Sequence, residues 1–181
     1  GALIVRDRLV GIRYTADAES THWFDAKMKQ VQDKLDTLLP ATTNTVSIPQ
    51  QPESPWVLVS SESDRHPLVI RIYNTETGAL DVIGSAYPNI DPRAMGRTQF
   101  VRYKARDGMD IPGWLTIPAG TDGKNLPMVV LVHGGPWVRG RTWNWNPEVQ
   151  FLAWRGYAVL EPDFRGTKGY GNEHYTAAFK Q

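Results

Sequence analysis

Residues 127–136 read Pro-Met-Val-Val-Leu-Val-His-Gly-Gly-Pro, and the interpretation of the whole chain starts from this stretch. Residues 128–132 are an unbroken apolar run, too short for a typical helix and rich in β-branched valine. Such a run predicts a parallel-sheet strand that is buried on both faces. The run stops at residues 133–136, where two glycines permit unusual backbone conformations and let another molecule approach the main chain. Pro136 is expected to fix the direction in which the chain leaves this turn.

A His-Gly-Gly turn of this kind has a known chemical use. After the third strand of an α/β-hydrolase, it offers backbone N–H groups to the oxyanion of an acyl-transfer reaction. Taken alone, the tetrapeptide is also compatible with a tight glycine turn that has no chemistry. The neighbouring segments must therefore decide between the two interpretations.

Length and charge limit the classes of protein to consider. The 181 residues suit one domain or slightly more than one, and 41% apolar content argues against disorder. Twenty basic and nineteen acidic residues give a net charge of +1 without a basic stripe, which excludes nucleic-acid and anionic-membrane partners. No apolar stretch approaches the roughly 18 residues of a membrane-spanning helix, and the first residues do not resemble a secretion signal. The compartment stays open.

Residue types also argue against metal and thiol chemistry. The sequence has no cysteine, so disulfides and thiolate catalysis are excluded. Its four histidines lie far apart, and no His-Glu-x-x-His motif occurs. We therefore expect neither a metal nor a cofactor.

The first forty residues predict a hairpin and a helix. Residues 3–5 and 9–14 are short alternating segments that suit two paired strands. A helix is predicted at residues 25–39 and is stopped by Pro40. Its apolar face is indicated by residues spaced four, three, four and three apart, namely Phe24, Met28, Val31, Leu35 and Leu38.

From Thr45 the apolar period changes to two. Four short segments, joined by turn-rich loops, predict an antiparallel meander the size of one β-propeller blade: residues 45–48, 56–61, 68–73 and 80–83. A single blade cannot bury both faces, so it requires neighbours. His66 falls in a turn of this meander and is interpreted as solvated. The proline-rich residues 86–97 are interpreted as a linker between domains.

The second half predicts a hairpin followed by a βαβ unit. Residues 100–105 and 111–117 flank Asp107-Gly108, a strong hairpin signal. After the strand at residues 128–132, Asn146-Pro147-Glu148 begins a helix that ends at Gly156 and whose apolar face is Val149, Leu152 and Ala153. Residues 157–160 form the second parallel strand. A glycine-punctuated loop at residues 163–171 then leads to a helix that starts near Asn172 and continues to the end of the sequence.

Four features, in this order, closely resemble the prolyl-oligopeptidase family of serine peptidases, particularly its acylaminoacyl-peptidase and dipeptidyl-aminopeptidase-like bacterial branch. They are the meander, the hairpin at residues 103–113, His133-Gly134-Gly135-Pro136, and Phe164-Arg165-Gly166-Thr167-Lys168-Gly169-Tyr170-Gly171. The segment from residue 147 to residue 159 fits the same family. The resemblance covers nearly the whole chain and is strongest from Arg102 onward.

The resemblance implies a mixed α and β fold in which an antiparallel β-propeller precedes an α/β-hydrolase sheet. Residues 1–96 are then the C-terminal part of the propeller domain, about one blade plus a helix. Residues 97–181 are the N-terminal part of the hydrolase peptidase domain, which is truncated. The family's nucleophile sits in a Gly-x-Ser-x-Gly turn, with the acid and base after it. All seven serines here precede His133 and none has that context, so no catalytic residue is assigned and the triad is expected beyond Gln181.

The resemblance also implies an oxyanion and substrate-pocket set, made of His133, Gly134, Gly135, Trp137 and Arg165. A backbone N–H at Gly134-Gly135 would supply one of the two oxyanion donors. His133, where some relatives carry an oxyanion-binding tyrosine, would order the turn, and Arg165 would hold its loop through carboxylate or carbonyl contacts. Trp137, with Trp143 and Trp145, would line a substrate pocket. The alternatives are an ordinary hydrogen-bonded histidine, a solvated arginine and core tryptophans.

The sequence therefore predicts a fragment of a serine peptidase that hydrolyses peptide or acyl-peptide bonds through an acyl-enzyme. The fragment contributes part of the oxyanion hole and is predicted to be inactive alone, because nucleophile, base and acid are all required. Its partner is a peptide substrate. Two alternatives remain: an esterase, which shares this machinery, and a non-catalytic binding module.

Overall fold

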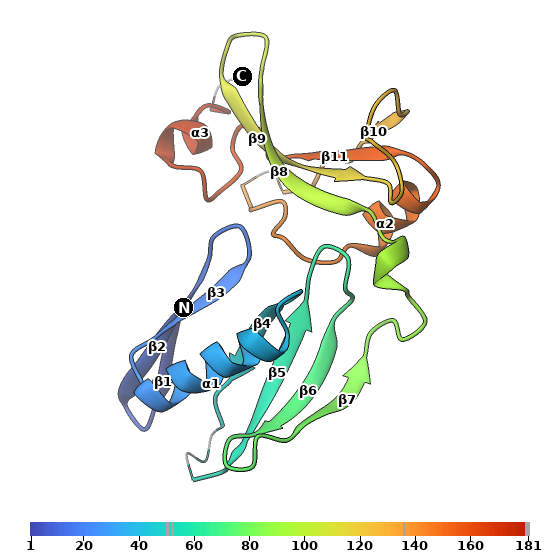
Figure 1. The fold of residues 1–181 in the computed structure, drawn as a ribbon. Helices are drawn as coiled ribbons and strands as arrows, with labels where there is room; N and C mark the ends of the chain where they lie inside the picture. Colours follow the sequence, from blue (N-terminus) through green and yellow to red (C-terminus); the bar gives the residue numbers. More distant parts are fainter. Residues whose placement is uncertain (50, 52, 136, 180–181) are drawn as a thin grey trace. The chain divides into compact units, whose positions relative to one another are not determined.

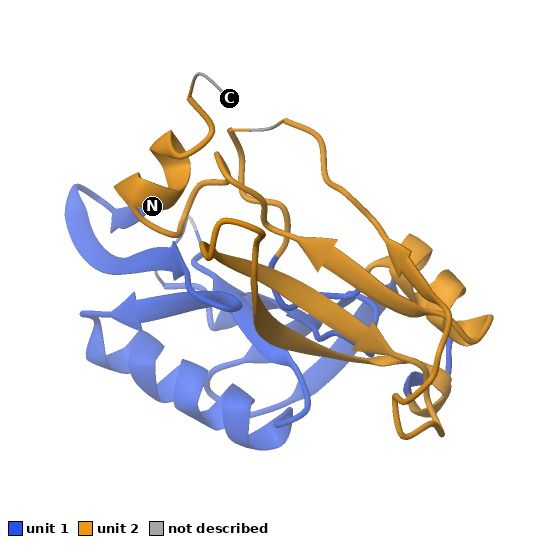
Figure 2. Ribbon diagram, turned by 90° about the horizontal axis from the view of Figure 1, so that it is seen from above, with its two compact units in different colours: residues 1–92, 142–145 blue, residues 93–141, 146–181 orange. Residues whose placement is uncertain are grey.

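The computed structural model describes residues 1–49, 51, 53–135 and 137–179. The fold is mixed α and β, rich in sheet and poor in helix (Figure 1). The chain divides into two compact units (Figure 2): unit 1 is residues 1–92 with 142–145, and unit 2 is residues 93–141 with 146–181. Pro136, predicted to direct the exit from the glycine turn, lies outside the described residues.

Unit 1 begins with a three-stranded antiparallel sheet, β1 (Ala2–Val5), β2 (Arg8–Thr15) and β3 (Glu19–Trp23). The predicted first hairpin is confirmed, because β1 and β2 pair antiparallel. Their connection places Arg6 and Asp7 at φ 45° and 60°, as a tight two-residue hairpin turn requires. The strand β3 was not predicted, since its residues Glu-Ser-Thr-His-Trp carry little apolar signal.

The predicted helix is confirmed as α1 (Ala26–Leu38), with Asp25 as its N-cap. The Asp25 carboxylate accepts the Met28 N–H at 3.0 Å, satisfying one of the free donors of the first turn. The predicted apolar face is wrong at its two ends. Phe24 precedes the N-cap, where helical periodicity no longer applies, and Leu38 is the last helical residue; both are half exposed.

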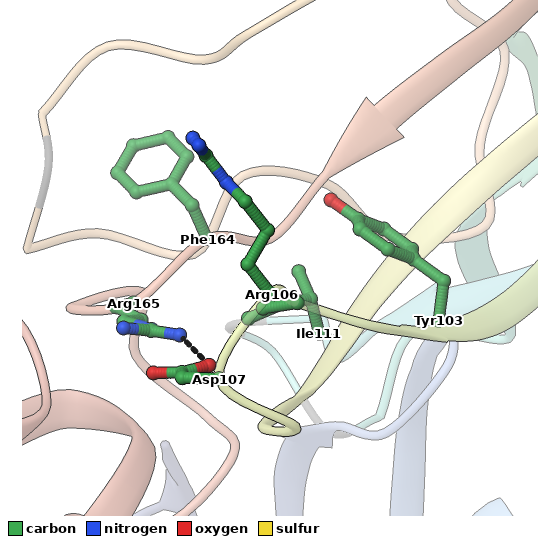
Figure 3. A pocket seen from close by; sticks show the side chains of 7 residues that line it. Tyr103, Arg106, Asp107, Ile111, Phe164 and Arg165 are labelled. Atoms are coloured by element: carbon green, nitrogen blue, oxygen red, sulfur yellow. Dashed lines mark hydrogen bonds and ion pairs between the residues drawn. The ribbon is translucent and has the colours of Figure 1, made fainter.

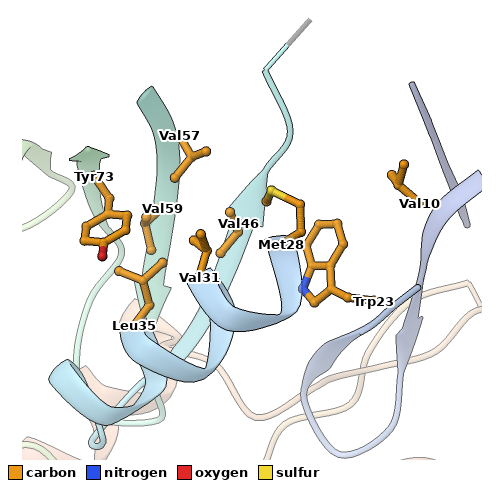
Figure 4. Packing of buried hydrophobic residues seen from close by; sticks show 9 residues of the cluster. All are labelled: Val10, Trp23, Met28, Val31, Leu35, Val46, Val57, Val59 and Tyr73. Atoms are coloured by element: carbon orange, nitrogen blue, oxygen red, sulfur yellow. The ribbon is translucent and has the colours of Figure 1, made fainter. Parts of the chain in front are cut away.

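The antiparallel meander is also confirmed. Its strands β4 (Thr43–Ser47), β5 (Trp56–Glu62), β6 (Val69–Asn74) and β7 (Leu80–Ser85) pair in sequence order. Helix α1 packs on one face of this sheet. The buried cluster there joins helix and sheet residues (Figure 4), among them Met28, Val31, Leu35, Val46, Val57, Val59 and Tyr73. Alternate β5 residues point away from this cluster, so Trp56 and Leu58 are exposed.

The prediction that His66 is solvated is wrong. The imidazole is half buried, and its Nδ1 forms a 2.9 Å hydrogen bond with the Ser63 hydroxyl. Burial, as the largest cause, lowers the pKa of His66. The same Ser63 oxygen accepts the N–H groups of Arg65 and His66. These groups form a closed structural turn, in which the 1% exposed Ser63 is inaccessible as a nucleophile.

Unit 2 is built on a four-stranded sheet with the order β10-β11-β9-β8. The hairpin predicted around Asp107-Gly108 is confirmed as β8 (Arg97–Lys104) and β9 (Asp110–Ile117). The βαβ unit is confirmed as β10 (Met128–Val130), α2 (Pro147–Trp154) and β11 (Ala158–Pro162), whose two strands are parallel. Asn146 caps α2 by accepting the N–H groups of Glu148 and Val149.

Three expectations for unit 2 are corrected. Strand β10 is an edge strand that ends at Val130, with Met128 and Val130 about half exposed, so it is not buried on both faces. The expectation of burial on both faces fits the central strand β11 better than it fits β10. On α2, Leu152 was expected on the buried face together with Val149 and Ala153. Leu152 is only partly buried, and Gln150 is buried instead. Helix α3 (Asn172–Thr176) starts where predicted but ends before the predicted C-terminal continuation.

The register of this sheet brings three segments to one edge. Strand β9 runs antiparallel to β11 with Gly113 opposite Pro162, so the tip of the β8-β9 hairpin lies at the carboxyl end of β11. The carboxyl end of β10 is at the same edge, because β10 and β11 are parallel. Ligands of open α/β sheets bind at this edge.

No helix in the described ranges is long and apolar enough to cross a membrane.

The buried Gln150 supplies a test of unit 2. Its amide accepts the Gly96 N–H at 2.7 Å and donates to the Gly96 carbonyl at 2.9 Å. Gln150→Leu leaves both groups buried without these partners, and each orphaned group costs about 1–3 kcal/mol. We expect unit 2 to lose about 3 kcal/mol of unfolding free energy in urea titrations, with faster hydrogen exchange at Gly96.

The matched control is Gln99→Leu on the exposed face of β8, which should stay within about 0.5 kcal/mol of the unmodified chain. Equal losses in the two variants would show that the Gln150–Gly96 pair is unimportant.

Candidate functional site

The His-Gly-Gly turn leaves the sheet directly after β10. Leu131 makes the last sheet hydrogen bond, from its N–H to the Leu160 carbonyl at 2.8 Å. Gly134 and Gly135 lie outside the strands of the described chain. Gly135 has φ 136°, and a Cβ there would lie 2.7 Å from the Val138 side chain, so this position requires glycine. Gly134 has open space around its Cα.

His133 is anchored through both ring nitrogens. Nδ1 donates to the Gly134 carbonyl at 2.8 Å, since a carbonyl oxygen can only accept. Nε2 lies 3.0 Å from the hydroxyl of the fully buried Thr167, and in the neutral ring it accepts that hydroxyl proton. The imidazole also stacks on Phe164, with ring centres 4.4 Å apart and planes 15° apart. The side chain thus ties the glycine turn to the loop after β11.

Asp163 is the central acid of the site, and sequence reasoning missed it. It follows β11 directly and is 1% exposed. Its Oδ1 accepts the Gly140 N–H at 3.1 Å, and its Oδ2 accepts the Tyr170 hydroxyl at 2.6 Å. His133 Nε2 is 3.7 Å from Oδ1. An acidic residue directly after a buried strand was the signal that could have identified it.

Tyr170 and His174 complete this network. Burial, reinforced by the hydrogen bond to Asp163, raises the pKa of Tyr170, which keeps the phenol protonated as a donor. His174 is buried, and its Nε2 lies 3.0 Å from the Asp163 carbonyl and 2.9 Å from the Phe164 carbonyl. A nitrogen facing two carbonyls is protonated, so it fixes the start of the loop as a donor. Sequence reasoning noted His174 only as remote from the other histidines.

Trp137 packs within unit 2. Its ring contacts Tyr175 and Phe179 edge-on, at 5.4 and 5.2 Å between centres. It also covers Gly166, where a Cβ would lie 2.7 Å from the indole. Trp143 and Trp145 belong instead to unit 1, where Trp145 packs on Tyr87. The three tryptophans thus belong to different units, and their role in a substrate pocket stays a prediction.

Arg165 binds a carboxylate at the tip of the β8-β9 hairpin. Its guanidinium lies 2.5 Å from Asp107 Oδ1 (Figure 3). This hydrogen bond is the largest cause that lowers the pKa of Asp107. The contact joins the loop after β11 to the hairpin tip, which are two of the three segments at this edge.

A cavity of about 200 Å³ opens beside the turn. Val132, His133, Gly140 and Asp163 line one part of it. The nearly buried ion pair of Arg141 and Glu161 lines another. Among the described residues, no group of three His, Cys, Asp or Glu side chains could hold a metal ion.

Comparison with known proteins places the chain in a family. No family model matches the chain. Dipeptidyl aminopeptidase BIII of Pseudoxanthomonas mexicana is 31% identical over 160 residues, which are 84% of this chain and 23% of that protein. Dipeptidyl peptidase family member 6 of Caenorhabditis elegans is 30% identical over 139 residues, covering 65% of this chain and 18% of that protein. The chain thus spans about a quarter or less of the relatives it matches.

Solved structures share the fold over almost the whole chain. A prolyl endopeptidase matches 98% of it with a TM-score of 0.64 at 18% identity, over 26% of the endopeptidase chain. Dipeptidyl peptidase 4 of Porphyromonas gingivalis matches 94% with a TM-score of 0.61 at 16% identity, over 25% of its chain. The homologues are peptidases. The chain belongs to the prolyl-oligopeptidase family, of whose members it matches a segment.

The close approach of Gly140 to the site provides a prediction. A Cβ at Gly140 would lie 2.6 Å from Asp163 Oδ1 and would also overlap the His133 ring. Gly140→Ala should therefore displace both side chains and cost about 1–3 kcal/mol of stability, because a packed region accommodates an added methyl poorly. Thermal unfolding and the His133 imidazole NMR signals measure the two effects.

Gly134→Ala is the matched control, because the space around Gly134 is open. It should change stability by less than about 0.5 kcal/mol and leave the His133 signals in place. A Gly140→Ala variant that behaves like this control would contradict the packing described for the site.

Proposed function

We propose that this chain is part of a serine peptidase that hydrolyses peptide or acyl-peptide bonds through an acyl-enzyme, and that it contributes one half of the oxyanion hole. The observation that carries the proposal is the His133-Gly134-Gly135 turn, which leaves the strands at the carboxyl edge of the sheet and is anchored there through His133. A backbone N–H of this turn donates to the oxyanion of the tetrahedral intermediate. Loss of one such donor typically costs about 3 kcal/mol of barrier.

The site residues divide this work. Gly134 and Gly135 supply the N–H group, and the glycine requirement at Gly135 keeps the main chain accessible. His133 orders the turn through its bonds to Gly134 and Thr167, so its role is positioning. Arg165 holds the loop after β11 through Asp107. Trp137 supports the same loop by covering Gly166.

The two units fit the two domains of the family. We propose that residues 1–96 are the end of a β-propeller, since the meander of unit 1 is antiparallel and exposes Trp56 and Leu58 on the face away from α1. Residues 97–181 are the start of the α/β-hydrolase domain. Nucleophile, acid and base then come from sequence beyond Gln181, and a propeller limits access to small peptides.

The test compares this chain with the protein encoded by its parent reading frame. The 181-residue chain should not react with a fluorophosphonate probe and should not cleave p-nitroanilide or p-nitrophenyl ester substrates. The parent should be labelled at a serine in a Gly-x-Ser-x-Gly turn and should cleave peptide anilides. Hydrolysis of esters alone would favour the esterase alternative.

Stoichiometric labelling of any of the seven serines in this chain would overturn the proposal. A parent without a reactive serine would do the same, and would favour a non-catalytic binding module.

A further inference from the structure

A second, larger cavity lies at the same sheet edge as the glycine turn. Its volume is about 450 Å³, within the usual range of ligand pockets. The hairpin tip and the loop after β11 form its walls (Figure 3), with contributions from Tyr103, Arg106, Asp107, Ile111, Phe164 and Arg165. Neither the oxyanion donors nor the proposed chemistry uses this cavity.

The cavity carries a net positive charge. It contains two guanidinium groups, from Arg106 and Arg165, and one carboxylate, from Asp107. Arg165 engages that carboxylate at 2.5 Å. Arg106 makes no hydrogen bond or ion pair within the described part of the chain. One cationic group is therefore available to a ligand, beside an ion pair that is already formed.

The other walls suit an apolar or planar body. Tyr103, Ile111 and Phe164 present ring and aliphatic surface around the Arg106 side chain (Figure 3). Phe164 also stacks on His133, which hydrogen-bonds to Gly134. The cavity and the glycine turn are thus neighbours that share the Phe164–His133 pair. One peptide of a few residues can reach both.

We propose that this cavity is a subsite for a carboxylate group of the peptide substrate, with Arg106 as the residue that binds it. An arginine fork matches the two oxygens of a carboxylate, and a net charge of +1 suits a monoanion. The aliphatic part of the Arg106 side chain lies between the Tyr103 and Phe164 rings in the cavity wall (Figure 3). The inference rests on the proposed peptidase function, because that function supplies the peptide.

The carboxylate has two sources in a peptide, the C-terminus and an acidic side chain. Three N-acetylated alanine-based tripeptides separate them: a free C-terminal acid, a C-terminal amide with a central aspartate, and a neutral amide. NMR titration of the 181-residue chain measures their affinities without any catalysis. We expect at least one acidic peptide to bind and to shift signals of residues 103–107 and 164, while the neutral peptide does not.

Arg106→Gln should weaken binding of that peptide at least fivefold. The matched control is Arg102→Gln, which removes an exposed arginine that lies 5.3 Å over Phe100 and does not line the cavity. This control should bind within twofold of the unmodified chain. Equal weakening in the two variants would show that the overall positive charge of the chain, and not Arg106 itself, is responsible for binding. That result would overturn the proposal.

Asp107→Asn is expected to strengthen peptide binding, a result that misfolding of the variant would not produce. It removes the one carboxylate that the described residues contribute to the cavity wall, while keeping an oxygen for the Met109 N–H. Repulsion of the ligand is then lost, so binding should tighten at least threefold. Unchanged or weaker binding, or equal binding of the neutral peptide, would contradict the proposal.

Failure of this subsite is distinguishable from failure of the proposed function. If the parent is labelled by the fluorophosphonate probe but no acidic peptide binds the cavity, only the carboxylate subsite is wrong. If acidic peptides bind through Arg106 but the parent has no reactive serine, only the peptidase function is wrong.

Discussion

The structure at the carboxyl edge of the unit 2 sheet depends on the hydrogen bonds that the buried Asp163 carboxylate accepts. A buried anion is costly unless it is hydrogen-bonded, and this one accepts the Gly140 N–H and the Tyr170 hydroxyl. Its own carbonyl accepts from His174. These donors come from the segment after the glycine turn, from the loop after β11 and from α3. One residue therefore holds three separate pieces of chain around the end of a strand, two through its carboxylate and one through its main-chain carbonyl.

This arrangement leaves the main chain of Gly134 and Gly135 accessible and holds the neighbouring His133 side chain in place. Gly140 has no side chain because His133 and Asp163 occupy the space next to its Cα. His133 in turn hydrogen-bonds to the Gly134 carbonyl through one ring nitrogen and to the Thr167 hydroxyl through the other. An oxyanion donor must be oriented before the reaction, since reorientation during catalysis would cost part of the stabilisation. In the function that we propose, the network supplies that orientation; the Phe164–His133 stack connects the network to the neighbouring cavity.

Local sequence signals predicted most elements. The helix period at Met28, Val31 and Leu35, the Asn146 cap and the Asp107-Gly108 hairpin each depend on neighbouring residues, and the structure has all three. Burial was harder to predict, because it depends on which strands are neighbours: β10 reads as a buried strand but lies at an edge. The partners of Asp163 and Gln150 were missed for a related reason. The Asp163–Gly140 and Gln150–Gly96 pairs span 23 and 54 positions, and no local pattern encodes such a contact.

The central claim is that the His133-Gly134-Gly135 turn donates a backbone N–H to a tetrahedral oxyanion. The most direct measurement is a structure of the parent protein with a peptide boronic acid bound to its reactive serine, which places a tetrahedral oxygen at the reacting centre. We predict a boronate oxygen about 2.7–3.1 Å from the backbone nitrogen of Gly134 or Gly135. Such an oxygen held only by groups outside residues 133–135 would contradict the claim.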